Sequence, residues 1–359
     1  MMEPLDQLTL VIPTLNRSEY VHRQVRHWQE HPIHLLIVDG SPGSRALPAG
    51  GKCQIRHIRQ EKSFQERMTL ASQLVETPFV ALCGDDDLYL ASGLSSCLEM
   101  LKLRPEIIGG VGPSIRFSVR SGSLYAEPIN WGVGEKRGVS DNGLSRLAAI
   151  YAEPKLDSQM YGIYRTPVWK LSVQSAYERH YASAYAYEFL LLLLMSYQGS
   201  VGVHQKLMWL SSTENPSTMS SAGFNRYFRN SDWLMDAAFA EEVALAKSTV
   251  AVALSRVGVH QISEIMPLID QCFSLWQRRY ELKGSRLHRW KPKFLIRRLL
   301  PFLPSFLKMF FRDRLPPSVQ ALAGSRIFPW STVERQATLF EIRCDESELQ
   351  AAARTILGD

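Results

Sequence analysis

The chain has 359 residues, of which 45% are hydrophobic and 21% are charged, and its formal net charge is +6. This length and composition argue against a small stapled domain, a disordered chain and a polytopic membrane protein. Five cysteines without a closely spaced pair are typical of core thiols in a reducing compartment. The first residues contain no basic stretch followed by a long apolar run, so we expect no signal peptide and a cytoplasmic protein.

Short apolar runs in the first 112 residues predict buried strands that alternate with helices. The runs cover residues 8–12, 34–38, 55–58 and 79–83. Apolar side chains at helical spacing follow three of these runs, at Val21, Val25 and Trp28, at Met68, Ala71 and Val75, and at Leu94, Leu98 and Leu101. This alternation predicts an α/β fold, in which a Rossmann-like, mixed but mainly parallel sheet has flanking helices on both faces.

The pattern becomes more helical further along the chain. Residues 114–119 and 159–164 predict strands, and residues 143–151 and 185–197 predict helices. A helical region is expected over residues 232–280, followed by a short strand near 338–344 and a terminal helix. We therefore expect a first domain over residues 1–225 and a mainly helical C-terminal region over residues 226–359.

Polar residues follow three of the predicted strands at the point where each strand ends. Thr14, Asn16 and Arg17 follow the first strand, Asp39 the second, and residues 85–87 the fourth. Because ligands bind at the carboxyl ends of parallel strands, we expect these groups to converge on one edge of the sheet. Asp39 is suited to accept hydrogen bonds from a ribose or a base edge, and equally to close a turn with the next residue. Thr14 and Asn16 are also ordinary turn formers.

Three consecutive aspartates, Asp85, Asp86 and Asp87, give the strongest chemical signal in the sequence. Adjacent like charges repel each other unless a cation or hydrogen-bond donors compensate them. Mg²⁺ and Mn²⁺ prefer carboxylate oxygens and keep positions open for substrate phosphates, so the triplet predicts a metal–diphosphate site. The alternative is that Asp87 caps the helix expected near residues 91–103.

Two further charged residues lie on predicted helices. Arg67, in the first turns of a helix that Ser63 caps, either reaches a phosphate or is a solvated surface residue. Glu188 interrupts an apolar helix, and a buried carboxylate is costly unless it is paired or functional. It is either a general base for a sugar hydroxyl or half of a structural ion pair. His204 and Glu214 are weaker candidates for extra ligands or acceptor contacts.

A basic segment, residues 283–314, contains ten Lys and Arg and one acid, interleaved with bulky apolar side chains. Such a segment suits the headgroup layer of an anionic membrane, and the alternative is the charged outer face of a helical domain. Its apolar content exceeds what contact with phosphates requires, so we expect no nucleic-acid partner. The longest apolar run, residues 189–195, is too short to span a bilayer.

The N-terminal half resembles the family-2 type of nucleotide-sugar-dependent glycosyltransferases with the GT-A fold. The resemblance rests on three motifs taken together, residues 11–17 (VIPTLNR), 36–41 (LIVDGS) and 85–90 (DDDLYL). A bacterial subgroup of that family is similar in two more features, an acid in a late apolar helix, here Glu188, and a Glu-Asn-Pro loop, here residues 214–216. The resemblance extends over about residues 7–220 and is weaker after residue 112.

The resemblance implies roles for particular residues. Asp39 would bind the base, Asp85 the ribose side and Asp86 the metal that bridges the diphosphate, and Glu188 would be the catalytic base. Gly84 stands where many relatives have the first Asp of the metal motif, so we extend the predicted ligands to Asp87. In full, we predict nucleotide-sugar contacts from Pro13, Thr14, Asn16, Arg17, Asp39, Arg67 and Asp85, metal ligation by Asp86 and Asp87, and catalysis by Glu188.

These features predict an inverting glycosyltransferase that depends on Mn²⁺ or Mg²⁺. It would move a sugar from a nucleotide sugar to a hydroxyl of a glycan or lipid-linked acceptor, in bacterial surface-polysaccharide synthesis. The basic segment would attach it to the inner face of the cell membrane. Two alternatives stay open. A sugar nucleotidyltransferase usually has a Gly-rich basic loop where this chain has residues 13–16, and the other alternative is an inactive membrane-associated binding module.

Overall fold

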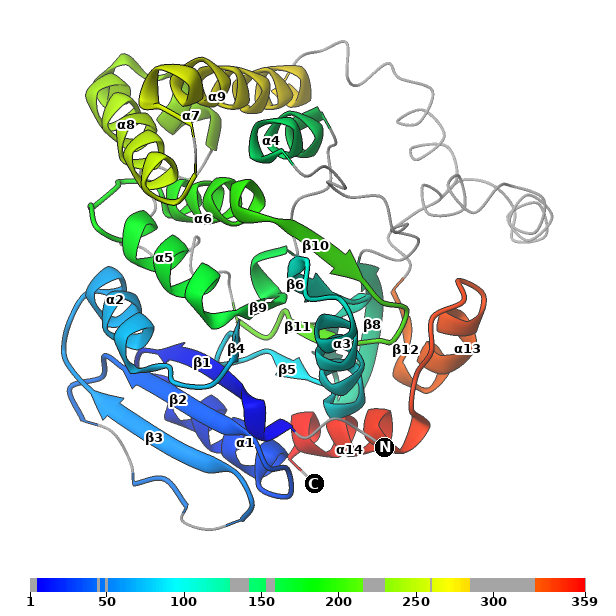
Figure 1. Ribbon diagram of the computed structural model, residues 1–359. Coiled ribbons are helices and arrows are strands. Elements are labelled where there is room, and N and C mark those ends of the chain that lie inside the picture. The colour runs from blue at the N-terminus through cyan, green and yellow to red at the C-terminus, as the bar shows by residue number, and fades with distance from the viewer. Residues whose placement is uncertain are drawn as a thin grey trace.

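The computed structural model describes residues 5–43, 46–48, 51–129, 142–152, 159–215, 230–258, 260–284 and 327–358 (Figure 1). The strands are β1 (Leu8–Thr14), β2 (His34–Asp39), β3 (Gln54–Arg59), β4 (Phe79–Leu82), β5 (Leu88–Tyr89), β6 (Ile107–Val111), β7 (Ser114–Arg120), β8 (Ser123–Ile129), β9 (Ile163–Arg165), β10 (Ser200–Val203), β11 (Trp209–Ser212) and β12 (Phe328–Pro329). The α-helices are α1 (Ser18–Trp28), α2 (Phe64–Leu74), α3 (Ala91–Leu103), α4 (Gly143–Ala152), α5 (Thr166–Ala176), α6 (Ala184–Gln198), α7 (Asn230–Met235), α8 (Ala240–Val257), α9 (Ile262–Gly284), α13 (Val333–Thr338) and α14 (Glu346–Leu357).

The larger sheet of the described residues has the strand order β10-β6-β9-β4-β1-β2-β3. β1 lies between β4 and β2 and is parallel to both, and β2 is parallel to β3. β9 runs antiparallel between β4 and β6. The predicted fold class, a mixed but mainly parallel sheet with flanking helices, is therefore confirmed.

Successive side chains of the central strands point to opposite faces of this sheet. Both faces are apolar, and helices cover both. Val11 packs in a core with α2, α5 and α6, whereas its neighbours Leu10 and Ile12 pack in a second core with α1 and α3. The predicted capping box begins α2, since Ser63 and Glu66 bond each other's backbone N–H groups. Each helix thus buries the apolar face that its sequence spacing predicts.

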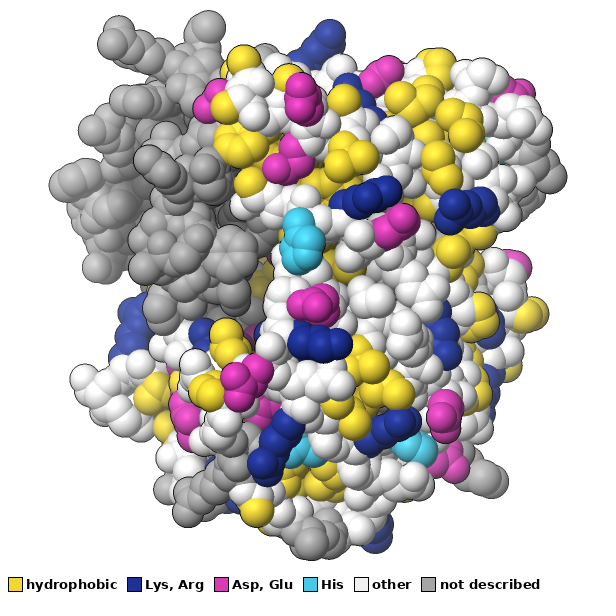
Figure 2. Space-filling model, turned by 90° about the vertical axis from the view of Figure 1, so that its left-hand side faces the viewer, with side chains coloured by type: hydrophobic (Ala, Val, Ile, Leu, Met, Phe, Trp, Pro, Cys, Tyr) yellow, Lys and Arg dark blue, Asp and Glu magenta, His cyan; other side chains and the backbone are white. Residues whose placement is uncertain are grey.

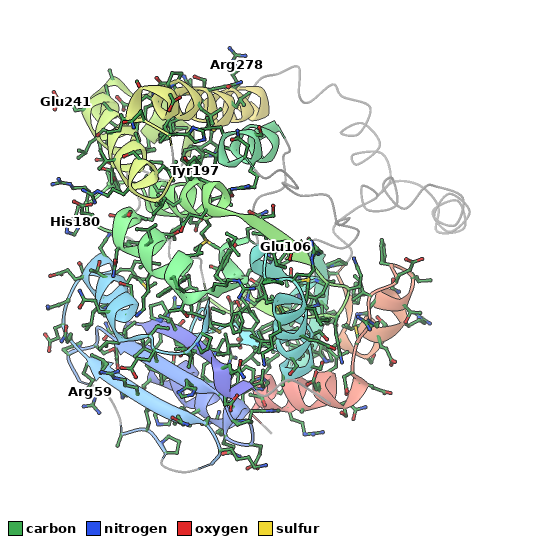
Figure 3. The ribbon with its side chains drawn as sticks, viewed as in Figure 1. Arg59, Glu106, His180, Tyr197, Glu241 and Arg278 are labelled. Atoms are coloured by element: carbon green, nitrogen blue, oxygen red, sulfur yellow. The ribbon has the colours of Figure 1, made fainter. Side chains whose placement is uncertain are left out.

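A further helical layer lies above α6 (Figure 1). α4, α8 and α9 all contact one another or α6, and Phe189 on α6 stacks on Trp276 of α9 with ring centroids 3.8 Å apart. Figure 3 places Tyr197 at the α4 side of α6, where Arg146 of α4 donates to the carbonyls of Ser196 and Tyr197. These bonds satisfy carbonyl groups that the end of α6 leaves without helical partners.

The region after residue 226 is divided between two cores. α8 and α9 pack on α6, whereas α13 and α14 pack on a second sheet with the order β12-β8-β7-β11-β5. The strand predicted near residues 338–344 is wrong: α13 ends at Thr338, and only an isolated bridge joins Arg343 to Lys206. The apolar alternation there instead packs Ile342 into the core of the second sheet.

Of the predicted strand at residues 159–164, the first three residues form a 3-10 turn and β9 begins at Ile163. Almost all of the basic segment lies outside the described residues. Within the described part of the chain, no helix combines the length and apolarity that crossing a membrane requires. On the described residues of the face in Figure 2, acidic and basic side chains are interspersed.

Candidate active site

The ends of three adjacent parallel strands bring the predicted polar groups together. Strand register places Thr14 beside Asp39, and the backbone N–H of Cys83, just after β4, donates to the carbonyl of Val11. After β1 the chain turns at Asn16, whose φ of 56° is a left-handed conformation that Asn tolerates better than most residues. The predicted convergence on one sheet edge is therefore observed.

Asp39 ends β2 and has a hydrogen-bond partner on each carboxylate oxygen. Oδ1 accepts from the backbone N–H of Ser41 at 2.8 Å, and Oδ2 lies 3.2 Å from Nε2 of His57 on β3. Burial raises the pKa of Asp39, but hydrogen bonds from Ser41 and His57 outweigh it and hold that pKa below its usual value. Asp39 is thus an ionised acceptor that also closes the turn, so both roles considered for it are compatible.

Arg67 is neither a solvated surface residue nor a free cation. Only 4% of it is exposed, and its Nη1 donates to the carbonyls of Thr14 at 2.6 Å and Val38 at 2.8 Å. Its Nε donates to the carbonyl of Lys62. A Cβ on Gly40 would lie 2.9 Å from the Arg67 guanidinium, so glycine lets the turn pass over it. Arg67 therefore links the end of β1 to the end of β2 through hydrogen bonds to their carbonyl groups.

Asp85 receives hydrogen bonds from the segment after β1. Thr14 Oγ1 donates to Oδ2 at 2.8 Å, and Nη1 of Arg17 donates to Oδ1 at 3.1 Å. Burial raises the pKa of Asp85, and the charge of Arg17 with the Thr14 hydroxyl opposes that rise. Pro13, the remaining residue predicted here, lies within β1 beside Val38. The first and fourth strands are therefore joined through side chains at this edge.

Asp87 does not cap the following helix. The N-cap of α3 is Leu90, with no side-chain cap, and Asp87 instead accepts from the Ser212 backbone N–H at 2.7 Å and from Trp209 Nε1 at 3.1 Å. Burial raises its pKa to about 7, against the effect of these two hydrogen bonds. Its carboxylate would lie 2.9 Å from a Cβ on Gly84. A side chain at residue 84 would therefore have to displace the buried carboxylate of Asp87.

Asp86 is the most exposed of the three aspartates, with 19% of its side chain accessible. Asn215 Nδ2 donates to its Oδ2 at 2.9 Å, and Nη1 of Arg17 lies 3.6 Å from the same oxygen. Among the described residues, Oδ1 of Asp86 has no hydrogen-bond partner. Asp86 is therefore the aspartate of this loop with an oxygen still available.

The donor set allows a test of whether a divalent cation fits. The described residues contain no group of three His, Cys, Asp or Glu side chains that could hold a metal ion unaided. Mg²⁺ and Mn²⁺ do not require one, because Mg²⁺ often binds one or two carboxylates and completes its shell with phosphates and water. Asp86 fits that mode. Asp87 fits it less well, because it is buried and its two oxygens already accept N–H bonds from Trp209 and Ser212.

Two polar residues of α1 hold residues 84–87, here called the aspartate loop. The sequence analysis did not predict either of them. The amide of Gln24 donates to the carbonyls of Gly84, Asp85 and Asp87, and Arg23 donates to that of Asp86. Both side chains are buried. The available signal was the position of Gln24 within the apolar stripe of α1, where a polar residue needs buried partners.

Glu188 lies on α6 with its side chain partly accessible. Its charge raises the pKa values of Tyr161 and Tyr177, after the larger effect of burial on each. Tyr161 also feels the charge of Asp87 and stacks on Trp209, with ring centroids 4.2 Å apart. Tyr161 is thus linked through Trp209 to Asp87, and its pKa also responds to the charge of Glu188.

No protein-family model matches the chain, and no curated protein matches it in sequence. In fold it is similar to the crystal structure of S. aureus TarS 1–349, with 12% identity, a TM-score of 0.48, and coverage of 97% of this chain and 90% of that one. The structures of TarS 1–349 with UDP-GlcNAc and with UDP cover the same shares, at 14% and 11% identity and TM-scores of 0.45 and 0.44. A likeness of this degree assigns no activity to the chain.

Proposed function

We propose that this chain is an inverting glycosyltransferase that takes its sugar from a nucleotide sugar. The supporting observation is that the segments after β1, β2 and β4 contact one another at the carboxyl edge of the sheet. Thr14 bonds Asp85, the Asn16 N–H donates to Ser41 Oγ at 2.7 Å, and Arg67 joins β1 to β2. That edge is where α/β sheets bind nucleotides.

The nucleoside end of the substrate is assigned to Asp39 and Asp85. Asp39 is ionised and pre-oriented by its two partners, which suits an acceptor for the N–H groups of a base. Asp85 faces the ribose side. Arg17 has 28% of its side chain accessible, so its remaining N–H groups can reach a phosphate. Thr14 and Arg67 would act indirectly, by holding Asp85 and the strand ends in place.

The diphosphate is assigned to a divalent cation, Mn²⁺ or Mg²⁺, held by Asp86. When bound, such a cation supplies positive charge that stabilises the departing nucleoside diphosphate. Asp87, predicted as a second ligand, is left out of the proposed metal site because it is buried and its oxygens both accept N–H bonds. Its two donors, Trp209 and Ser212, instead join it to β11.

Glu188 is assigned the role of general base, which accepts the proton of the acceptor hydroxyl as that oxygen attacks the anomeric carbon. A partly accessible carboxylate on a largely buried apolar helix suits this role. Attack from the face opposite the nucleotide inverts the anomeric configuration. The acceptor would be a glycan or a lipid-linked sugar of a bacterial surface polysaccharide.

The test measures release of nucleoside diphosphate from a panel of nucleotide sugars in the presence of Mn²⁺. Asp86→Ala and Glu188→Gln are each expected to lower kcat by about 100-fold or more, because each removes a group that acts at the reacting atoms. Glu241→Gln is the matched control for Glu188, since Figure 3 shows Glu241 on the outer side of α8. Asp270→Ala, on the exposed part of α9, is the control for Asp86.

The results separate the proposal from its alternatives. Normal turnover by Asp86→Ala or Glu188→Gln, with unchanged thermal unfolding, would remove that residue from its role. Pyrophosphate release from a nucleoside triphosphate and a sugar phosphate would indicate a nucleotidyltransferase. Binding of nucleotide sugars without transfer or slow hydrolysis would indicate a binding module.

Peripheral attachment to the inner face of the cell membrane is part of the proposal and rests on the composition of the basic segment. The protein is expected to float with vesicles that contain anionic lipid. Neutralising the basic residues of 283–314 is expected to abolish flotation. If flotation does not change, the segment is not the membrane anchor.

A further inference from the structure

The segment that follows β11 is bonded to the aspartate loop, although the two lie about 125 residues apart in the sequence. The Ser212 N–H donates to Asp87, and the Asn215 side chain donates to Asp86. The next link is Glu214, whose Oε2 accepts from Nη1 of Arg23 at 2.6 Å. Residues 212–215, here called the β11 loop, therefore contact the aspartate loop both directly and through α1.

Arg23 is the centre of this arrangement. Its side chain is 6% exposed and that of Glu214 is 18% exposed, so the ion pair is mostly removed from water. The same guanidinium donates to the carbonyl of Asp86 and lies over the ring of Tyr20, 4.7 Å from its centroid. Arg23 thus holds the Glu214 side chain, next to Asn215 in the chain, and the backbone of Asp86, to which Asn215 bonds.

The bond from Asn215 has a specific consequence for Asp86. An ionised carboxylate can only accept hydrogen bonds, and the amide N–H of Asn215 donates to Oδ2 of Asp86. Oδ1 is left without a hydrogen-bond partner among the described residues, and the rotation of the carboxylate is restricted. Groups that hydrogen-bond a metal ligand in this way commonly decide its orientation and the affinity of the site.

We propose that Asn215 is the positioning residue of Asp86: it holds Oδ2 so that Oδ1 is presented to the divalent cation, and the Arg23–Glu214 pair holds Asn215 in place. This inference rests on the proposed function, in which Asp86 binds that cation. It assigns the β11 loop to the metal site, although Asn215 itself touches neither metal nor substrate.

Direct Mn²⁺ binding tests the inference without a turnover assay. Free Mn²⁺ is followed by electron paramagnetic resonance during titration of the full chain, alone and with UDP, GDP or ADP. Asn215→Ala is expected to weaken Mn²⁺ binding by about tenfold, as removal of a hydrogen bond to a metal ligand typically does. Asn215→Asp brings a second carboxylate beside Asp86, so it is expected to bind Mn²⁺ more tightly and to unfold at a higher temperature when Mn²⁺ is added.

Trp209→Phe is the matched control. It removes a hydrogen bond to the neighbouring Asp87 and leaves the contacts of Asp86 in place, so Mn²⁺ affinity is expected to stay unchanged. An equal loss in Trp209→Phe and Asn215→Ala would mean general loosening of the aspartate loop and would overturn the inference. Unchanged Mn²⁺ affinity in both Asn215 variants would also overturn it.

Failure of the proposed function gives a different result. If the unsubstituted chain binds no Mn²⁺ with any of these nucleotides, or if Asp86→Asn binds it as well as the unsubstituted chain, the metal role of Asp86 is wrong. If the unsubstituted chain binds Mn²⁺ and Asp86→Asn does not, while Asn215→Ala and Asn215→Asp bind it with unchanged affinity, then only the inference about Asn215 is wrong.

Discussion

The carboxyl edge of the large sheet and the helical layer around α6 are stabilised in different ways. At the sheet edge, Asp85, Asp87 and Arg67 are buried: the two aspartates accept hydrogen bonds from distant segments, and Arg67 donates to such segments. The helical layer is apolar, and α6 contributes a run of buried leucines to the core that it shares with α8 and α9. Polar contacts fix orientation, whereas apolar packing supplies stability with little directional constraint.

The difference indicates how the two regions should respond to substitution. Loss of an apolar side chain in the helical layer should lower stability in proportion to the volume removed. Loss of one hydrogen bond at the sheet edge should cost less stability but displace a group that touches the substrate. Three measurements test these expectations.

The largest effect on stability is expected from Leu190→Ala in the helical layer. Leu190 is fully buried on α6, and truncation of such a residue costs about 2–5 kcal/mol of unfolding free energy. Urea unfolding measures the change. The control is Leu245→Ala on α8, where 40% of the leucine is exposed and the expected change is within about 0.5 kcal/mol. Equal effects for the two leucines would contradict the apolar-core description.

A pH-dependent effect is expected from His204, which follows β10. Burial lowers its pKa to about 4, and the charges of Arg343 and Lys206 act in the same direction. Because the unfolded chain binds this proton near pH 6.5, His204 contributes stability above that pH and loses it as the pH falls toward 4, by up to about 3 kcal/mol.

The measurement compares urea unfolding of the unsubstituted chain and His204→Gln between pH 7.5 and 4.5. The difference between the two chains should narrow or reverse toward acid pH, since the glutamine cannot be protonated. A difference that does not vary with pH would show that His204 does not titrate in this range. The comparison isolates His204 from other groups, such as Asp87, that titrate in both chains.

The smallest effect on stability, combined with a large effect on binding, is expected from Gln24→Met. The substitution keeps the volume and removes the N–H groups that bond the carbonyls of the aspartate loop, at a cost of about 1–3 kcal/mol. Mn²⁺ affinity should fall because the backbone on both sides of Asp86 loses the bonds from Gln24. Gln29→Met, on the exposed residue after α1, is the control. A stability loss without any change in Mn²⁺ affinity would contradict the directional role of these bonds.

The sequence predicted the sheet edge well because period-2 and period-3.6 patterns locate strands and helices, and parallel strands place their carboxyl ends together. It could not show that Arg67 is buried or that Asp87 is bonded to Trp209 and Ser212, since those contacts join segments far apart in the chain. The capping box at Ser63 was predictable because its partners are three residues apart. The strand expected near residue 340 failed because apolar alternation also fits a turn packed on a core.

The return of the last segment to the N-terminal half has a consequence for biosynthesis. Glu348 of α14 accepts hydrogen bonds from the N–H and hydroxyl of Ser92, in the first turn of α3, and β12 pairs with β8. α14 also contacts α1, which bears Arg23 and Gln24. A nascent chain therefore lacks these contacts of α1 and α3 until α14, whose Glu348 is 256 residues beyond Ser92, has left the ribosome, so the active-site half can reach its final form only after α14 has been made.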